Sequence, residues 1–288
     1  MNFFEFNKKF PTELACIKYF IKIRYKNDIR CHHCNEKQVY HRADLPKMFQ
    51  CASCGNSFSI FKDTIFEKSS TDLRKWMYAI HLFLNGKKGI SALQLKREIG
   101  VTYKTAWRML KQIRIAMGNG DNIEFKNAIV RMDETYMKTN KKDNDNDKHG
   151  GNMGRSTKNN TPIVALHSNN TIKAFATEDT KAHTLLDIAF NNIEEGSEIH
   201  TDEYSSYKSF DMFYNHKSVN HSKEFVRNGV HTNNLENFFG TMKRGIYGIY
   251  HHISKKYLQN YVNEYCFRYN NRKDINVFDL LLSQCVGC

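Results

Sequence analysis

Proline and long apolar runs are both scarce in this sequence. Only 3 of the 288 residues are proline, which excludes proline-rich linkers between domains. No apolar run approaches the roughly 18 residues that a membrane-spanning helix needs, and the opening residues Met1 to Phe4 do not read as a secretory signal peptide. We therefore expect a cytoplasmic protein. Its length allows two or three domains with at least one full hydrophobic core.

Acidic residues are fewer than basic ones. The sequence has 30 aspartates and glutamates and 43 lysines and arginines, so its formal net charge is +13. This excess favours an anionic partner, most simply nucleic acid. An acidic membrane surface would attract the same charge. The abundance of asparagine, lysine and isoleucine is also typical of proteins from AT-rich genomes, so the charge alone does not identify the partner.

The cysteines are not scattered as they are in a disulfide scaffold. Four of the eight form two C-x-x-C pairs, Cys31/Cys34 and Cys51/Cys54, separated by residues 35–50. Each pair places two thiolates on one tight turn, and two such turns complete a tetrahedron around zinc. The alternative is a set of four reduced core thiols. With short strands between the pairs, the spacing predicts a zinc ribbon, a module that binds DNA, RNA or protein.

A helical stretch follows over residues 71–117, and glycine interrupts it at Gly86 and Gly100. Thr102 is the expected N-cap of the last and longest helix. A short helix, a turn with glycine and a longer basic helix are the pattern of a helix-turn-helix. The alternative is a plain three-helix bundle with a solvated charged face. The side chains expected to contact DNA from this helix are Lys104, Arg108 and Lys111.

The second half of the chain changes to short strands, which predicts an α/β domain with a mixed sheet. Asn169-Asn170 is expected to form a hairpin turn between two of these strands. The charged, low-complexity segment between Lys138 and Asn160 is interpreted as a mobile loop inside the domain. Strands are expected within 127–137, 161–168, 171–178, 197–207 and 216–221, and helices at 181–193 and from 233 onward.

Two of these strands end in an aspartate, Asp133 and Asp202, and the helix from 233 carries Glu236. Three carboxylates gathered by a fold repel one another unless cations share the site. Carboxylates are hard oxygen ligands that suit Mg²⁺ or Mn²⁺, and two such ions catalyse phosphoryl transfer. A single aspartate at a strand end is more often a turn or cap residue. The combination, in basic surroundings, indicates a metal site.

The order of zinc ribbon, helix-turn-helix, "MDETYM", "HTDEYSSY" and "HTNNLENFFGTMKRGIYGIYHHISKKYLQNYVNEYCFRYNNR" resembles the zinc-ribbon DDE transposases of bacterial insertion sequences. The resemblance extends from Cys31 to Arg272. It implies an RNase H-like core with a divalent metal, Mg²⁺ or Mn²⁺, and an Asp-Asp-Glu triad. The residues that match the family motif are Asp133, Asp202, Glu236 and the basic Lys243, with Asn233 as an alternative third member.

The resemblance implies a protein that binds double-stranded DNA at the ends of an element and in its target. It also implies a synaptic homodimer in the bacterial cytoplasm, associated with the nucleoid. Two alternatives stay open, namely a DNA-binding regulator without catalysis and a metal-dependent nuclease without joining activity. The expected domains are 1–62 (N-terminal segment and zinc ribbon), 63–120 (helix-turn-helix) and 121–288 (catalytic domain with the loop at about 138–160).

Further predictions concern single residues around the three carboxylates. Gly240, between Glu236 and Lys243, is expected to leave a bare patch of helix that DNA approaches closely while Lys243 reaches a phosphate. The alternative is an incidental glycine between exposed charges. Glu134 and Glu203 are expected to point away from the neighbouring aspartates by strand alternation. Arg244 adds to a basic rim, whereas the roles of His251, His252 and the C-terminal pair Cys285/Cys288 stay open.

Overall fold

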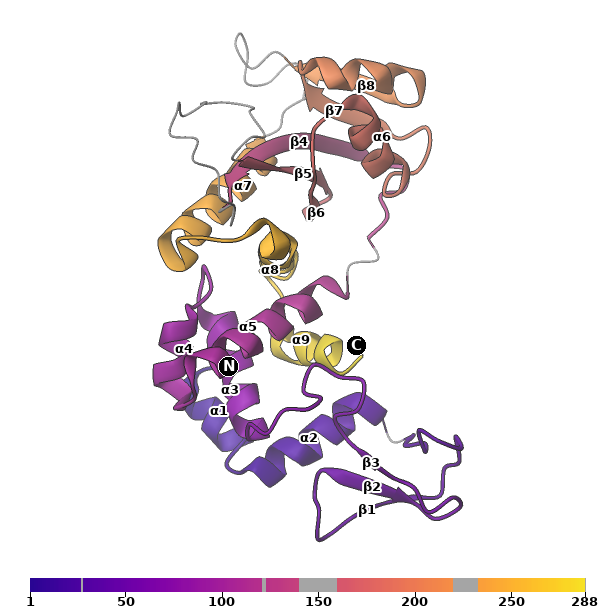
Figure 1. Ribbon diagram of the computed structural model, residues 1–288. Coiled ribbons are helices and arrows are strands. Elements are labelled where there is room, and N and C mark those ends of the chain that lie inside the picture. Colours follow the sequence, from indigo (N-terminus) through magenta and orange to yellow (C-terminus); the bar gives the residue numbers. More distant parts are fainter. Residues whose placement is uncertain (27, 121–122, 140–159, 220–232, 288) are drawn as a thin grey trace, which may run out of the picture. The chain divides into compact units, whose positions relative to one another are not determined.

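The computed structural model describes residues 1–26, 28–120, 123–139, 160–219 and 233–287 (Figure 1). The chain forms two compact units, one of Met1–Gly120 with Asp274–Cys288 and the other of Asp121–Lys273. The loop expected at about 138–160 falls almost wholly outside the described residues, as does Cys288. No helix in the described ranges is both long and apolar enough to cross a membrane.

The first unit combines a small antiparallel sheet with helices. The sheet has the strand order β1-β2-β3, which is the ribbon expected from the cysteine spacing. Its elements are α1 (Phe3–Lys9), α2 (Glu13–Tyr25), β1 (Val39–His41), β2 (Met48–Cys51), β3 (Ser57–Ser59), α3 (Leu73–Asn85), α4 (Ala92–Ile99), α5 (Tyr103–Gly118) and α9 (Val277–Val286).

Helices α4 and α5 begin and end where the sequence signals predict. Gly100 closes α4 in the left-handed region at φ 63°, where a side chain would be strained. Thr102 is the N-cap of α5, and its side chain accepts a hydrogen bond from the Thr105 backbone at 3.2 Å. The apolar stripe of α5 is buried, as its periodicity predicts; it consists of Ala106, Leu110, Ile113 and Met117.

Helix α9 belongs to the first unit, although the sequence analysis assigned residues up to 288 to the catalytic domain. It packs against α2, α3 and α5 and buries Leu281, Leu282 and Cys285 completely. The Tyr19 hydroxyl donates a hydrogen bond to Asp279 at 2.6 Å. The helix therefore completes a core whose other members lie far away in the sequence.

The second unit is built on a five-stranded mixed sheet with the order β6-β5-β4-β7-β8. The pairs β4–β5 and β5–β6 are antiparallel, whereas β4–β7 and β7–β8 are parallel. Its elements are β4 (Ile129–Lys138), β5 (Asn160–Ser168), β6 (Thr171–Ala176), α6 (Ala182–Phe190), β7 (Glu198–Asp202), η1 (Ser205–Met212), β8 (Asn215–Val219), α7 (Asn233–Gly245), η2 (Ile246–Tyr250), η3 (Lys255–Tyr257) and α8 (Leu258–Asn270).

The hairpin between β5 and β6 turns through Asn169 and Asn170, as predicted. Both residues have positive φ, 47° and 63°, which asparagine tolerates better than most residues. Ser168 and Thr171 close the turn as a pair. The mixed sheet expected from the sequence is thereby confirmed.

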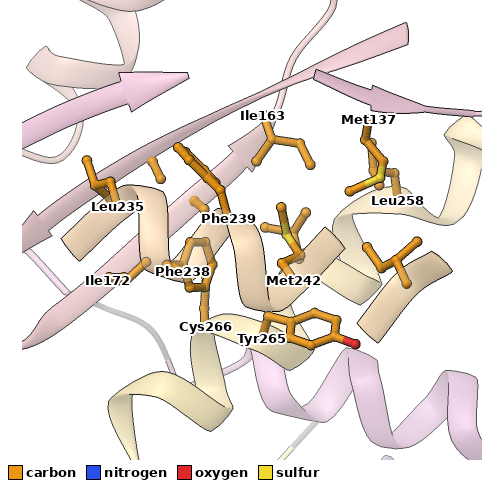
Figure 2. Packing of buried hydrophobic residues seen from close by; sticks show 14 of the residues in the cluster. Met137, Ile163, Ile172, Leu235, Phe238, Phe239, Met242, Leu258, Tyr265 and Cys266 are labelled. Carbon is orange, nitrogen blue, oxygen red and sulfur yellow. The ribbon is translucent and has the colours of Figure 1, made fainter. Parts of the chain in front are cut away.

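Helices cover both faces of this sheet. On one face, α7 and α8 pack Phe238, Met242 and Tyr265 against Ile163 and Met137 of the sheet (Figure 2). On the other face, α6 and η1 pack against alternate residues of β4, including Met132. Because side chains alternate along a strand, Asp133 lies on the α7 face and Glu134 on the η1 face.

Candidate functional site

The four cysteines of the two pairs form one cluster, as the sequence predicts. Their sulfur atoms all lie within 4.8 Å of one another. Sγ of Cys31 is 3.7 Å from Sγ of Cys54, and Sγ of Cys34 is 3.6 Å from Sγ of Cys51. A tetrahedral zinc ion with Zn–S bonds of about 2.3 Å separates its sulfurs by roughly 3.8 Å. The cluster therefore fits zinc in both donor type and size.

Each cysteine pair is shaped by a tight turn. The backbone N–H of Gly55 donates to the Cys51 carbonyl at 3.0 Å, and Gly55 has φ 71°, which suits glycine. The backbone and side-chain amides of Asn56 next to Cys54 lower the pKa of that thiol to about 6. A thiol with a lowered pKa is present as the thiolate that a metal requires.

Asp133 lies near the other two predicted carboxylates. Burial, followed by the negative charges of Glu134, Asp202 and Glu236, raises the pKa of Asp133 to about 8. Burial lowers the pKa of Lys243, and the charge of Asp133 acts against that shift. The fold therefore places Asp202, Glu236 and Lys243 within electrostatic reach of Asp133.

The three carboxylates are not drawn together to ligand distance. In the part of the chain that the structure describes, the cysteine cluster is the only group of three or more potential ligand side chains within 4.8 Å of one another. Glu236 is exposed on α7, whereas Asp133 and Asp202 are half-buried at the sheet. The charges of Asp202 and Glu236 act on Asp133, and a cation between the three carboxylates would reduce that repulsion.

Asp202 is the last residue of β7, and hydrogen bonds from residues on both sides of it in the chain hold it in place. The Tyr204 backbone N–H donates to its Oδ1 at 2.9 Å. The Thr201 hydroxyl donates to its carbonyl oxygen at 2.8 Å. Glu203, its neighbour, is exposed. The carboxylate is therefore held at the strand end by a turn and by the preceding side chain.

Glu134 points to the opposite face from Asp133, as strand alternation predicts. The Tyr207 hydroxyl donates to Glu134 Oε2 at 2.8 Å, and only 1% of Tyr207 is exposed. Burial, followed by the nearby carboxylates, raises the pKa of Tyr207 well above its ordinary value. Tyr207 was not among the residues predicted from the sequence, although its place within "HTDEYSSY" was a signal. Tyr207 and Glu134 connect η1 to the strand that carries Asp133.

On α7, the patch at Gly240 is not bare, which corrects the expectation from the sequence. A Cβ atom on Gly240 would lie 3.2 Å from Nη1 of Arg244. The Arg244 guanidinium also donates to the Thr241 hydroxyl at 3.3 Å. A positive charge therefore covers the helix between Glu236 and Lys243, and Asn233 lies one turn before Glu236 at the start of α7.

The three residues predicted to contact DNA from α5 differ in their surroundings. Lys104 is exposed. Arg108 is half-buried and donates to the Glu67 carbonyl at 2.9 Å, so it also fastens α5 to the segment before α3. The Lys111 ammonium lies 5.9 Å from the centre of the Trp107 ring. Lys104 is therefore the most accessible of the three.

Comparisons with known proteins agree with this arrangement. Residues 11–57 match the model of a transposase zinc-ribbon domain, and residues 127–270 match that of an ISXO2-like transposase domain. An "uncharacterized protein in transposable element ISH50" of Halobacterium salinarum is 26% identical over 280 residues, which cover 91% of this chain and 92% of that protein.

Among solved structures, the Mos1 strand transfer complex matches with a TM-score of 0.30 and 11% identity over 74% of this chain and 78% of that one. A pre-cleavage Mos1 transpososome matches with a TM-score of 0.27 and 10% identity over 73% and 77%. One family model matches the cysteine ribbon and the other matches the sheet that carries the carboxylates, and together they identify the family of this chain. The chain belongs to the ISXO2-like transposases, with a transposase zinc ribbon at its N-terminal side.

Proposed function

We propose that this protein binds the ends of an insertion sequence and catalyses metal-dependent cleavage and strand transfer of DNA. The observation that carries the proposal is the placement of Asp133 on β4, Asp202 at the end of β7 and Glu236 on α7 within a domain that matches the ISXO2-like transposases. In support, burial and neighbouring carboxylates that include Asp202 and Glu236 raise the pKa of Asp133 to about 8. A fold that places three carboxylates within electrostatic reach of one another is suited to bind cations between them.

Asp133, Asp202 and Glu236 are the proposed ligands of Mg²⁺ or Mn²⁺. When bound, the ions activate the attacking oxygen and stabilise the leaving oxygen of the phosphodiester. The attacking oxygen belongs to water during cleavage and to the freed 3′ end during transfer. Asn233 lies one helical turn from Glu236 and is the alternative third ligand.

Lys243 and Arg244 are proposed to hold the DNA backbone beside the carboxylates. Lys243 is half-buried within electrostatic reach of Asp133, so it meets a phosphate that approaches the metal site. Arg244 is exposed over Gly240. Contacts of this kind strengthen binding and orient the strand without reading its sequence.

The ribbon and the α4–α5 pair are proposed to recognise the element ends. Helix α4, the three-residue turn from Gly100 to Thr102 and the longer helix α5 form a helix-turn-helix, whose second helix enters the major groove. Lys104, Arg108 and Lys111 supply positive charge on α5. A homodimer that pairs the two ends is part of the proposal, as the family resemblance implies.

The test incubates the purified chain, labelled DNA that carries its element ends, and Mg²⁺ or Mn²⁺. Wild type is expected to cleave and join, whereas Asp202→Asn and Glu236→Gln lose at least about a hundredfold in rate because a metal ligand is missing. Glu203→Gln is the matched control, since it removes an exposed carboxylate next to Asp202 and should leave the rate unchanged.

The other outcomes decide between the alternatives. Activity that survives in Glu236→Gln but not in Asn233→Ala would move the third role to Asn233. End binding without any cleavage in either metal would favour a DNA-binding regulator. Cleavage without joined products would favour a nuclease.

A further inference from the structure

One stripe of α7 continues beyond the end of that helix. Glu236, Gly240 and Lys243 recur at helical spacing, and the next position of the stripe, four residues after Lys243, is Tyr247. Tyr247 is 44% exposed and belongs to the π-helical turn η2, which follows α7 directly. Four residues of helix advance about 6 Å along the axis. An exposed aromatic ring therefore lies about one turn beyond the lysine that is proposed to hold a DNA phosphate.

Tyr247 also lies beside the strand that carries Asp133. The backbone N–H of Lys138, the last residue of β4, donates to the Tyr247 hydroxyl at 3.4 Å. Asp133 precedes Lys138 by five residues, which is about 16 Å of strand. The helix on one side and the strand on the other therefore place Tyr247 on the α7 face of the sheet, within a few nucleotides' reach of the carboxylates.

The π-helical turn holds Tyr247 at the surface because other residues of η2 are anchored in the core. Ile246 is only 1% exposed. The Tyr250 hydroxyl donates to both oxygens of Glu264, a completely buried carboxylate of α8, at 3.0 and 3.1 Å. A π-helical turn is a rare distortion of a helix and is frequent at functional sites. The outward position of Tyr247 is thus set by the packing of the residues on both sides of it.

The turn ends at His251 in a backbone conformation that costs energy. His251 has φ 59° and ψ −56°, which residues other than glycine rarely adopt. Its backbone N–H donates to the Ile246 carbonyl at 2.9 Å, and its Nδ1 lies 3.0 Å from the Tyr247 carbonyl oxygen. Strained residues persist where the surrounding structure holds them, and they cluster at functional sites. The strain therefore supports a role for the ring that this turn presents.

Positive charges surround the exposed ring. Lys243 and Arg244 precede Tyr247 by four and three residues, so they are its neighbours on the helix surface. Arg244 and Lys138 are exposed, and Lys243 is half-buried. Proteins that bind single-stranded nucleic acid combine cations that hold the backbone with an aromatic ring on which a base stacks. The end of α7 and the turn η2 present this combination.

We propose that Tyr247 is a stacking platform for a base of the DNA strand whose phosphate Lys243 holds. The inference rests on the proposed function, because it requires DNA to reach the carboxylates along α7. A base inside a duplex has both of its faces covered by neighbouring bases, so the base on Tyr247 is unpaired or displaced from the stack. The ligand of this site is therefore a DNA end with a single-stranded or distorted nucleotide beside the phosphodiester that is cleaved.

The first test locates the base without any catalysis. The full-length protein is bound, without divalent metal, to DNA that carries its element end, with 5-iodouracil at successive positions around the junction with flanking DNA. Ultraviolet light crosslinks this base to an aromatic ring stacked on it, and peptide mapping is expected to find Tyr247 at one position. Bound DNA that gives no crosslink to Tyr247 at any position overturns the inference and leaves the proposed function standing. Failure to bind the end overturns both.

The second test separates stacking from other roles of the side chain. It measures the affinity of the full-length protein for an element end that is unpaired at the crosslinked position. Tyr247→Leu keeps an apolar side chain without a flat aromatic face and should weaken this binding about tenfold. Tyr247→Phe keeps the ring and loses only the hydroxyl beside Lys138, so it should retain the tight binding.

Phe190→Leu is the matched control for the loss of a surface ring. Phe190 is 50% exposed on α6, which packs on the opposite face of the sheet from α7, so this variant should bind the DNA as wild type does. Equal affinities of Tyr247→Leu and wild type overturn the inference. Equal losses in Tyr247→Phe and Tyr247→Leu overturn it as well, because the hydroxyl and not the ring would then be responsible.

Discussion

Two carboxylates of the second unit, Glu264 and Asp133, have opposite electrostatic surroundings. Glu264 is completely buried, yet Nε of Arg268 lies 3.0 Å from its Oε1 and the Tyr250 hydroxyl donates to both of its oxygens at 3.0 and 3.1 Å. The pKa of Asp133 is instead raised by burial and by the other carboxylates around it. The first arrangement is what structure alone requires, because a buried charge needs a partner. The second destabilises the metal-free protein and is typical of a functional site.

The raised pKa of Asp133 makes the stability of the metal-free protein depend on pH. The folded state holds the proton up to about pH 8, whereas the unfolded chain releases it near the ordinary value of 3.8. Below both values Asp133 contributes no penalty, and its contribution to stability falls as pH rises between them. Asp133→Asn should therefore be more stable than wild type at pH 8, by at least about 1 kcal/mol, with a smaller difference at pH 4.

Urea unfolding of both proteins at several pH values, without divalent metal, measures this difference. Asp187→Asn removes an exposed carboxylate elsewhere in the same unit and should follow wild type at each pH. A constant difference between Asp133→Asn and wild type from pH 4 to pH 8 would contradict the prediction.

At the scale of single elements, some helix boundaries could be predicted from nearby residues, whereas other helices could not be predicted at all. Gly100 and Thr102 mark their helix ends because their conformational and capping preferences act within a few residues. Helices α1 and α2 were not predicted from the sequence, since the apolar residues of α2 do not form one clear stripe. The π-helical turn η2 was not predicted from the sequence either. Its last residue, Tyr250, bonds to Glu264 on α8, a contact between distant residues.

Gly100 gives a test at this scale. Its φ of 63° lies in the left-handed region, and a Cβ added there meets no atom within 4 Å, so any effect of Gly100→Ala comes from the backbone alone. The substitution should lower the free energy of unfolding by about 1 kcal/mol. Gly248→Ala is the matched control, because it also meets open space but lacks positive φ, and it should be neutral or slightly stabilising. Thermal unfolding of both variants measures the difference, and equal effects would refute the backbone explanation.

At the scale of the whole molecule, the pattern of short strands predicted the mixed sheet and the cysteine spacing predicted the zinc ribbon, because each depends on residues close together in the sequence. It did not predict that the last helix returns to the first unit. The side chains of α9 are apolar enough to pack in either unit, and its partners on α2, α3 and α5 lie more than a hundred residues earlier. Contacts between distant residues of the candidate site could not be predicted from the sequence either. The motifs identified Asp133, Asp202 and Glu236, whereas Tyr207 and Thr201 emerged only from their contacts.

A chain that ends at Lys273 tests the role of α9. Without it, α2, α3 and α5 expose apolar surface, and the first unit should lose most of its stability, whereas residues 121–273 keep their own core. Limited proteolysis should then degrade residues 1–120 and leave a protected fragment that begins near 121. A truncated chain whose N-terminal region resists protease as well as wild type would show that α9 is dispensable.

The return of α9 also bears on the order of events during protein synthesis. The ribosome makes residues 1–120 before residues 121–273, yet the helix that completes the core of residues 1–120 is made only after both. A nascent chain therefore contains Asp133, Asp202 and Glu236 before its N-terminal unit has α9. Any frameshift or stop codon upstream of Val277 removes the last helix from the first unit. The stability of the first unit thus depends on translation in the correct reading frame as far as α9.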